Sequence, residues 1–172
     1  VRENIKINDL KNLVNIQAET LFLDRSKNIL NSNTESNLTD RYGNNFKSKK
    51  FEYNLNNKNI KIFRAVIKDN DKNNFKLNEA IIDLETNSLN GKNIEINLNN
   101  KFLNPENEPR LKGENIFYSG NITNIINGEF TACKKTEKCP PWKLSAKKIT
   151  HDRNKKNISY KNVWLNIYDT PV

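Results

Sequence analysis

The sequence predicts an all-β fold, an open stack of antiparallel strands, and three observations lead to it. Apolar and polar residues alternate along short runs such as Ile94-Glu95-Ile96-Asn97-Leu98, a period that gives a strand one apolar face. Polar breaks rich in Asn, Asp, Gly and Lys separate these runs and divide the chain into about a dozen strands. No window sustains the apolar spacing of a capped amphipathic helix.

The individual elements follow from the same two signals. The clearest alternating runs predict strands at 51–55, 60–62, 94–98 and 163–167. The polar breaks predict turns at 24–28, 56–59, 69–73, 90–91, 119–120, 127–128 and 152–157.

Three segments need separate treatment. Residues 77–89 fit either a short helix or a strand that is buried on both faces, and we favour the strand. Residues 99–116 contain two prolines, which predicts a long surface loop. Pro140 and Pro141 impose an extended path before a strand that begins at Trp142.

A faint internal repeat indicates how the strands are organised. Segments that begin at Ala18, Ala65 and Ala146 share an apolar strand residue, an Asp and a Lys/Asn turn that leads into the next apolar run. One such unit cannot bury its apolar face alone, so stacked copies predict an elongated molecule. We expect residues 1–172 to form a single domain. Chance similarity among Asn/Lys-rich turns is the alternative reading of the repeat.

The formal net charge of +9 raises the question of an anionic partner. The basic residues are spread along the chain, and the abundance of Lys, Asn and Ile is typical of AT-rich genomes, so we favour compositional bias as the main cause. The motifs of the common nucleic-acid-binding modules are absent from the sequence. We therefore expect no nucleic-acid partner.

The residues that would carry catalysis are sparse. His151 is the only histidine, and its neighbour Asp152 would point to the opposite face of a strand. Cys133, Cys139 and His151 are too few, at no established spacing, for a zinc site. None of the five glycines lies in a phosphate-binding array. We expect no enzyme activity, no metal and no cofactor.

The alternating runs do supply a large apolar face. An open stack with such a face can bind acyl chains, because removing apolar surface from water is favourable by roughly 25 cal/mol per Å². Ordinary core packing is the alternative, and a one-residue error would exchange the two faces of a strand. The candidates for the lining of a lipid groove are Phe51, Tyr53, Ile60, Ile62, Ile81, Ile94, Ile96, Phe117 and Phe130.

From Pro109 onward, several short motifs occur in a specific order. They are Pro-Arg-Leu-Lys-Gly from Pro109, Gly-x-Phe-Thr-x-Cys from Gly128, Pro-Trp-x-Leu-x-Ala from Pro141, then His-Asp, an aromatic strand and a final Pro-Val. This order resembles the end of the periplasmic N-terminal domain in the lipopolysaccharide-assembly family LptD. The first hundred residues match only through the repeat, which is similar to the OstA-type repeat of LptA, LptC and LptD.

The resemblance implies a fold, a function and partners. The fold would be an OstA/LptA-like β-jellyroll, a bent pair of sheets with a hydrophobic groove. The groove would receive lipopolysaccharide from the periplasmic LptA bridge, docked on an N-terminal edge strand, and pass it to the LptD barrel, which LptE accompanies. The chain would lie on the periplasmic side of the outer membrane, with the barrel after residue 172.

Two other functions stay open. A free-standing LptA- or LptC-like bridge protein would share the groove but would not need the cysteine and Pro-Pro-Trp segment. A carbohydrate-binding β-solenoid would need a row of carboxylates and aromatic residues on one exposed face, and the sequence shows no such row.

The resemblance also bears on the cysteines and on the basic residues. Cys133 matches the family position that forms a long-range disulfide to the barrel. Cys139 is absent from some relatives, so the two cysteines could pair with each other or with distant partners. Arg110 and Lys112 are our candidates for contacts to lipid phosphates at the mouth of the groove.

Overall fold

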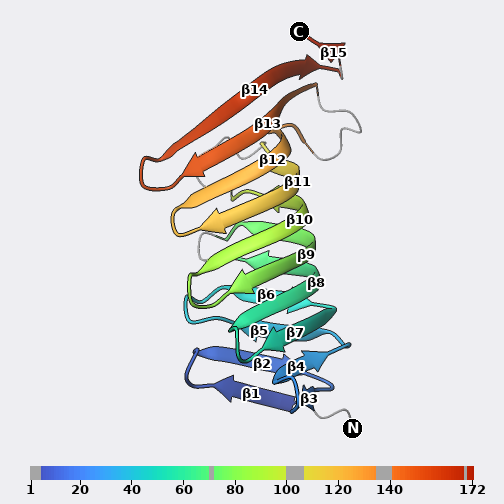
Figure 1. Ribbon diagram of the computed structural model, residues 1–172. Helices are drawn as coiled ribbons and strands as arrows, with labels where there is room; N and C mark the ends of the chain where they lie inside the picture. Colours follow the sequence, from blue (N-terminus) through green and yellow to red (C-terminus); the bar gives the residue numbers. More distant parts are fainter. Residues whose placement is uncertain (1–4, 70–71, 100–106, 135–140, 169) are drawn as a thin grey trace.

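The computed structural model describes residues 5–69, 72–99, 107–134, 141–168 and 170–172. Within them the chain is all-β, and fifteen strands form one open antiparallel sheet. The strands lie one above another, with the two ends of the chain at opposite ends of the stack (Figure 1). The predicted all-β stack of antiparallel strands is confirmed.

The strands fall into a short group and a long group. The short ones come first and are β1 (Ile5–Asp9), β2 (Val14–Ala18), β3 (Phe22–Asp24), β4 (Ile29–Ser32), β5 (Ser36–Thr39), β6 (Asn45–Ser48) and β7 (Lys50–Asn54). The long ones are β8 (Asn59–Lys68), β9 (Asn74–Asp83), β10 (Ser88–Asn97), β11 (Arg110–Ser119), β12 (Ile122–Thr131), β13 (Trp142–Asp152) and β14 (Asn157–Ile167). The two-residue strand β15 (Thr170–Pro171) follows them.

The sheet branches at β8. The first half of β8 pairs with β7, where Ile60 lies opposite Tyr53, and the second half pairs with β6, where Ile67 lies opposite Phe46. The β7 branch continues to β4 and β3, and the β6 branch continues to β5, β2 and β1. From β8 onward, each strand pairs with the next one in the sequence. Each long strand therefore extends across the width of the sheet that two short strands, one from each branch, cover in the N-terminal part.

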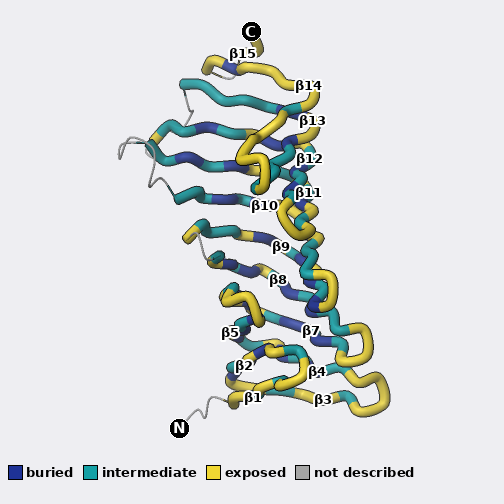
Figure 2. The backbone as a smooth tube through the Cα atoms, turned by 90° about the vertical axis from the view of Figure 1, so that its left-hand side faces the viewer, coloured by how far each residue is buried: buried dark blue, intermediate teal, exposed yellow. Residues whose placement is uncertain are grey.

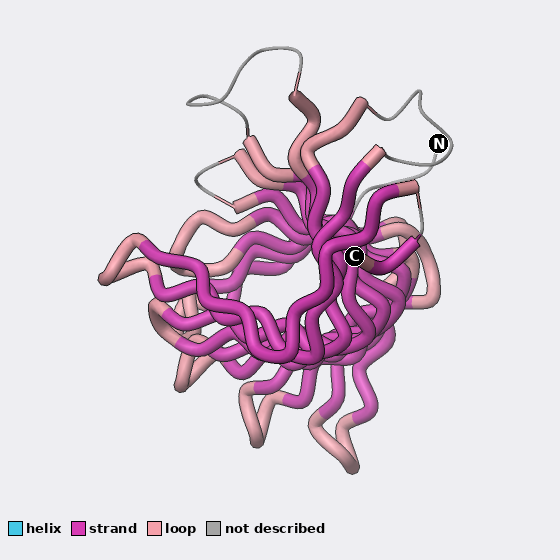
Figure 3. Tube along the Cα trace, turned by 90° about the horizontal axis from the view of Figure 1, so that it is seen from above, coloured by secondary structure: helices cyan, strands magenta, loops and turns pink. Residues whose placement is uncertain are grey.

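Every second long strand contains a residue in the left-handed region near its middle. Arg64, Asn93, Asn127 and Asn162 have φ values of 48°, 50°, 49° and 50° within β8, β10, β12 and β14. The register skips the same places, for example between the pairs Ile126↔Lys148 and Gly128↔Ala146. Such a residue in an antiparallel pair is typical of a β-bulge, which bends the strand. Seen along the stack, the strands curve around the interior (Figure 3).

Glycines on the inner side of these bends make room for neighbouring side chains. A Cβ atom on Gly128 would lie 2.6 Å from Cδ1 of Ile149, and one on Gly113 would lie 2.3 Å from Cγ2 of Ile125. The turns predicted at 90–91 and 127–128 are wrong, since both Asn-Gly pairs lie inside strands. An Asn-Gly pair usually signals a hairpin turn. Here both pairs lie inside strands, at places where side chains of neighbouring strands come close to the glycine.

Two of the other expectations need correction. Residues 77–89 are strand rather than helix, as favoured, but they span the end of β9, a turn and the start of β10. The expected burial on both faces is wrong, because Ile81 is 42% exposed between the buried Ala80 and Ile82. The loop predicted at 99–116 is wrong from Arg110 onward, because β11 begins there. A proline excludes only its own position from a central strand, and the alternation resumes directly after Pro109. The strand predicted to begin at Trp142 is confirmed.

The Asp of the repeat shapes hairpin turns. Oδ1 of Asp24 accepts the backbone N–H groups of Ser26 and Lys27 at 3.0 and 3.2 Å, and Oδ1 of Asp152 accepts that of Lys155 at 3.0 Å. Short polar side chains that bond to the backbone ahead of them favour turns. Exposed residues gather at these hairpins and buried residues follow the strands (Figure 2).

Candidate functional site

The inner face of the N-terminal half is a packed core. Phe51 and Ile62 are fully buried, and Tyr53 and Ile60 are 1% and 2% exposed. They belong to one apolar cluster together with residues of both branches of the sheet. These four groove candidates face inward, as predicted, but they line neither of the two cavities described below.

Further along the stack, the inner face borders a cavity of about 750 Å³. Its walls come from the long strands β9 to β14 and from the turns beside them. The principal apolar lining residues are Phe75, Ile96, Leu98, Leu111, Ile125 and Ile149.

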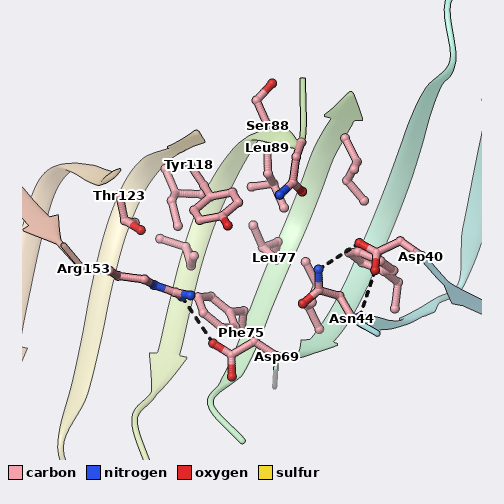
Figure 4. Close-up of a pocket in the computed structure, with 16 residues that line it drawn as sticks. Asp40, Asn44, Asp69, Phe75, Leu77, Ser88, Leu89, Tyr118, Thr123 and Arg153 are labelled. Carbon is pink, nitrogen blue, oxygen red and sulfur yellow. Dashed lines mark hydrogen bonds and ion pairs between the residues drawn. The ribbon is translucent and has the colours of Figure 1, made fainter. Parts of the chain in front are cut away.

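A smaller cavity of about 80 Å³ lies between the packed core and the larger cavity (Figure 4). Ile94, Ile116 and Leu77 contribute apolar walls to it. Phe75, Thr123 and Arg153 line both cavities, so the two spaces adjoin at these side chains.

An ion pair spans the mouth of the interior at this junction. Nη2 of Arg153 lies 3.5 Å from Oδ2 of Asp69 (Figure 4). Asp69 follows the end of β8 and Arg153 follows the end of β13, and these two strands run in opposite directions. The two residues therefore belong to opposite edges of the bent sheet. The guanidinium of Arg153 also lies 5.7 Å from the ring centroid of Tyr118.

Two further links cross between the same edges closer to the N-terminus. Nη2 of Arg41, in the turn between β5 and β6, donates to the carbonyl oxygen of Leu84 at 2.9 Å. The hydroxyl of Tyr53 donates to Oδ2 of Asp9 at 2.6 Å. Burial and the negative charge of Asp9 raise the pKa of Tyr53 far above its ordinary value, so the hydroxyl stays protonated as the donor.

The remaining groove candidates divide between the two faces. Ile96 lines the larger cavity, Ile94 lines the smaller one, and Phe130 packs against the core with its ring centroid 6.0 Å from that of Trp142. The prediction that Ile81 and Phe117 face inward is wrong, since these side chains are 42% and 43% exposed.

The error has a physical cause. Each of these residues has an apolar neighbour that points inward instead: Ile82 is 6% exposed beside Ile81, and Ile116 is 2% exposed beside Phe117. The bends shift the in-and-out alternation within each long strand. If residues are assigned to the inner and outer face by continuing the alternation from one end of a strand, the assignment is therefore wrong at the other end.

The predicted headgroup contacts lie away from the cavities. The guanidinium of Arg110 donates to the backbone carbonyls of Glu108 and Cys133, and Lys112 is exposed. Neither residue lines either cavity. The basic residues that do line the larger one are Arg153 and Lys156, which sequence reasoning did not select because they lie in a polar turn.

Cys133 forms no disulfide with another described residue, and its Sγ atom lies 3.7 Å from the carbonyl oxygen of Trp142. Cys139, Pro105 and Pro140 lie outside the described residues. The pairing of the two cysteines stays a prediction.

Edge strands occur at both ends of the stack. In the described part of the chain, β1 pairs only with β2, and β3 pairs only with β4. At the other end, β14 pairs with β15 through Asn166 and Ile167 alone. Unpaired backbone groups along such edges can accept a further strand.

The described residues contain no group of three His, Cys, Asp or Glu side chains that could hold a metal ion. In the same residues, no helix could cross a membrane. What the arrangement offers is a cavity with Ile, Leu and Phe side chains in its walls, which Arg153 and Lys156 also line. No protein family and no curated protein matches the chain.

Proposed function

We propose that this chain is a lipid-transport module that binds lipopolysaccharide by its acyl chains and passes it toward an outer-membrane translocon. The observation that carries the proposal is the cavity of about 750 Å³ on the inner face of the sheet, lined by Ile, Leu and Phe. Cavities of roughly 300–1,000 Å³ are typical of sites that bury most of a small ligand.

The energetics favour an acyl chain as the occupant. Each methylene group removed from water contributes about 0.8 kcal/mol, so five inserted methylenes contribute about 4 kcal/mol. The lining also contains polar residues, Asn73, Asn99, Thr123 and His151, beside the apolar ones.

The architecture adds support. A bent antiparallel sheet around an apolar interior is the arrangement that the resemblance to the LptD periplasmic domain implies, an OstA/LptA-like β-jellyroll. In this proposal LptA adds a strand at the N-terminal edge formed by β1 and β3. The LptD barrel, with LptE, follows the C-terminal end. The chain then works on the periplasmic side of the outer membrane.

The proposal is tested by displacement of a neutral fluorescent probe, N-phenyl-1-naphthylamine, from the purified chain. We expect lipopolysaccharide to displace the probe, and we expect the polysaccharide freed of its lipid portion to leave the probe bound. Displacement by the delipidated polysaccharide with equal potency would contradict the proposal and favour a carbohydrate-binding protein. The variant Ile96→Asp, which places a charge in the cavity, is expected to weaken probe binding. Ile81→Asp, on the outer face, is the matched control.

A further inference from the structure

The outer face of the sheet carries two adjoining hollows at the bends of the long strands. One, of about 250 Å³, is lined by β12, β13 and β14, and the other, of about 550 Å³, is lined by β10, β11 and β12. Asn127 and Glu129 line both hollows, which therefore form one furrow across the strands β10 to β14. Neighbouring strands lie about 4.7–4.9 Å apart, so this outer furrow is roughly 19 Å long.

The outer furrow follows the bends. The pairing register between neighbouring strands is interrupted there, and one exposed residue of each strand lies at the interruption: Asn93, Glu114, Asn127, Lys147 and Asn162. The small residues Gly128 and Ala146 are buried in the same lining. Polar side chains therefore stand along a surface that is hollowed between them.

A second row of side chains runs beside the first. Residues directly opposite each other on antiparallel strands share a face, and the register pairs Glu95 with Lys112, Lys112 with Glu129, Glu129 with Ser145, and Ser145 with Trp164. Trp164, at the β14 end of this row, is 61% exposed. The row joins carboxylates and an aromatic residue on one outward face. The sequence alone does not show it, because each member comes from a different strand.

Hydrogen bonds hold several of these polar groups in place. Nδ2 of Asn127 donates to Oε2 of Glu114 at 2.8 Å. Nδ2 of Asn166, a residue that is 8% exposed, donates to Oγ of Ser145 at 2.9 Å. Side chains that are already held lose less conformational freedom when a ligand binds, which favours affinity.

The chemistry of the outer furrow suits a saccharide. Its carboxylates belong to Glu95, Glu114 and Glu129, and its ammonium groups belong to Lys112 and Lys147, so the two signs nearly balance and neither a polyanion nor a polycation is favoured. Amide and hydroxyl side chains both donate and accept hydrogen bonds, as sugar hydroxyls do. The flat apolar face of an indole ring carries negative potential, which is complementary to the C–H side of a pyranose ring.

We infer that the outer furrow binds a linear, uncharged oligosaccharide, with one sugar ring stacked on Trp164 and sugar hydroxyls bonded to Asn127, Glu129 and Ser145. This site lies on the outer face, whereas the acyl-binding cavity lies on the inner face. The inference therefore goes beyond the proposed function and does not depend on it.

The test is calorimetric titration of the full chain with linear hexasaccharides of glucose, mannose and N-acetylglucosamine. We expect at least one of them to bind, and we expect hexagalacturonate, which carries a charge on every ring, to bind more weakly. If none of the three binds, or if hexagalacturonate binds as tightly, the assignment of an uncharged oligosaccharide is overturned.

Variants locate the site. Trp164→Ala is expected to weaken binding about tenfold, and Trp164→Tyr, which keeps an aromatic face, is expected to retain most of the affinity. Tyr168→Ala removes an aromatic side chain that is 66% exposed and lines neither hollow, and it is the matched control. Equal affinities of Trp164→Ala and the unmodified chain would place the saccharide elsewhere and overturn the inference.

A second pair of variants tests the bends. Asn127→Gly removes an amide from the furrow at a residue with a φ of 49°, a conformation that glycine adopts readily, and is expected to weaken binding about fivefold. Arg64→Gly changes a residue of similar φ that lines neither hollow and is expected to leave the affinity unchanged. Saturating saccharide is expected to leave N-phenyl-1-naphthylamine bound to the inner cavity. Displacement of that probe would mean that the saccharide enters the cavity, which contradicts the inference.

Discussion

The hydroxyl of Tyr53 donates a hydrogen bond of 2.6 Å to Oδ2 of Asp9, joining β7 to the end of β1 across the interior. Nδ2 of Asn12 donates to both partners at 2.8 Å. Tyr53 is 1% exposed, so this network belongs to the buried part of the N-terminal half. The link joins two branches of the sheet, both of which pair with β8.

Removal of the Tyr53 hydroxyl is expected to destabilise the fold. Tyr53→Phe keeps the ring in the core but deletes the bond to a carboxylate, a change that costs about 1.5–3 kcal/mol. Urea unfolding at neutral pH measures it. Tyr168→Phe, at a residue that is 66% exposed, is the control and is expected to change the free energy of unfolding by less than about 0.5 kcal/mol.

The same network predicts acid sensitivity. Burial acts to raise the pKa of Asp9, but hydrogen bonds from Tyr53, Asn12 and Lys11 outweigh it and hold the pKa below the ordinary value of 3.8. A carboxyl with a lowered folded pKa stabilises the fold above its unfolded pKa, and this stabilisation is lost as the pH falls through the folded pKa. Asp9→Asn should therefore show a flatter fall of melting temperature between pH 5 and about pH 2. If the melting temperatures of Asp9→Asn and of the unmodified chain fall in parallel with pH, Asp9 does not have this role.

The bends can be tested at Gly128. A methyl group there would meet Cδ1 of Ile149 at 2.6 Å, and overpacking of this kind costs about 1–3 kcal/mol. Valine at position 149 lacks that atom. In a double-mutant cycle, Ile149→Val is expected to recover part of the loss caused by Gly128→Ala. If the losses of stability of Gly128→Ala and Ile149→Val simply add in the double variant, the contact with Cδ1 of Ile149 does not determine the cost of Gly128→Ala.

The contrast between packed core and cavity predicts opposite responses to added volume. Ile62 is fully buried in the packed half, whereas Ile96 lines the cavity of about 750 Å³. Ile62→Phe is expected to cost about 1–3 kcal/mol through overpacking. Ile96→Phe has room for the ring and is expected to cost less than about 1 kcal/mol while reducing the capacity for the neutral probe. Equal losses of stability at the two sites would mean that the cavity is absent in solution.

The strands were predictable from the sequence because alternation is a local property. The runs at 51–55, 60–62, 94–98 and 163–167 overlap β7, β8, β10 and β14. The inward orientation of Phe51, Tyr53, Ile60 and Ile62 followed for the same reason.

The bends were not predictable in this way. Asn127-Gly128 has the composition of a hairpin turn, and only the approach of Ile149 from the next strand explains the glycine. Because a bend shifts the alternation, the faces of Ile81 and Phe117 could not be read from one end of a strand.

The ion pair at the mouth of the interior joins residues that are remote in the sequence. Asp69 and Arg153 both lie in polar turns, and nothing local distinguishes them from the other Asp and Arg residues of such turns. They meet only because the sheet bends.

Site-specific photocrosslinking in cells tests the central claim, an acyl-binding groove, most directly. A photoreactive amino acid replaces Ile96, Leu111 or Ile125 in the cavity, and Ile81 or Phe117 on the outer face as controls of similar polarity. The account predicts lipopolysaccharide adducts at the three cavity positions and none at the two outer ones. Adducts on both faces alike, or at none of the five positions in folded and exported protein, would contradict it.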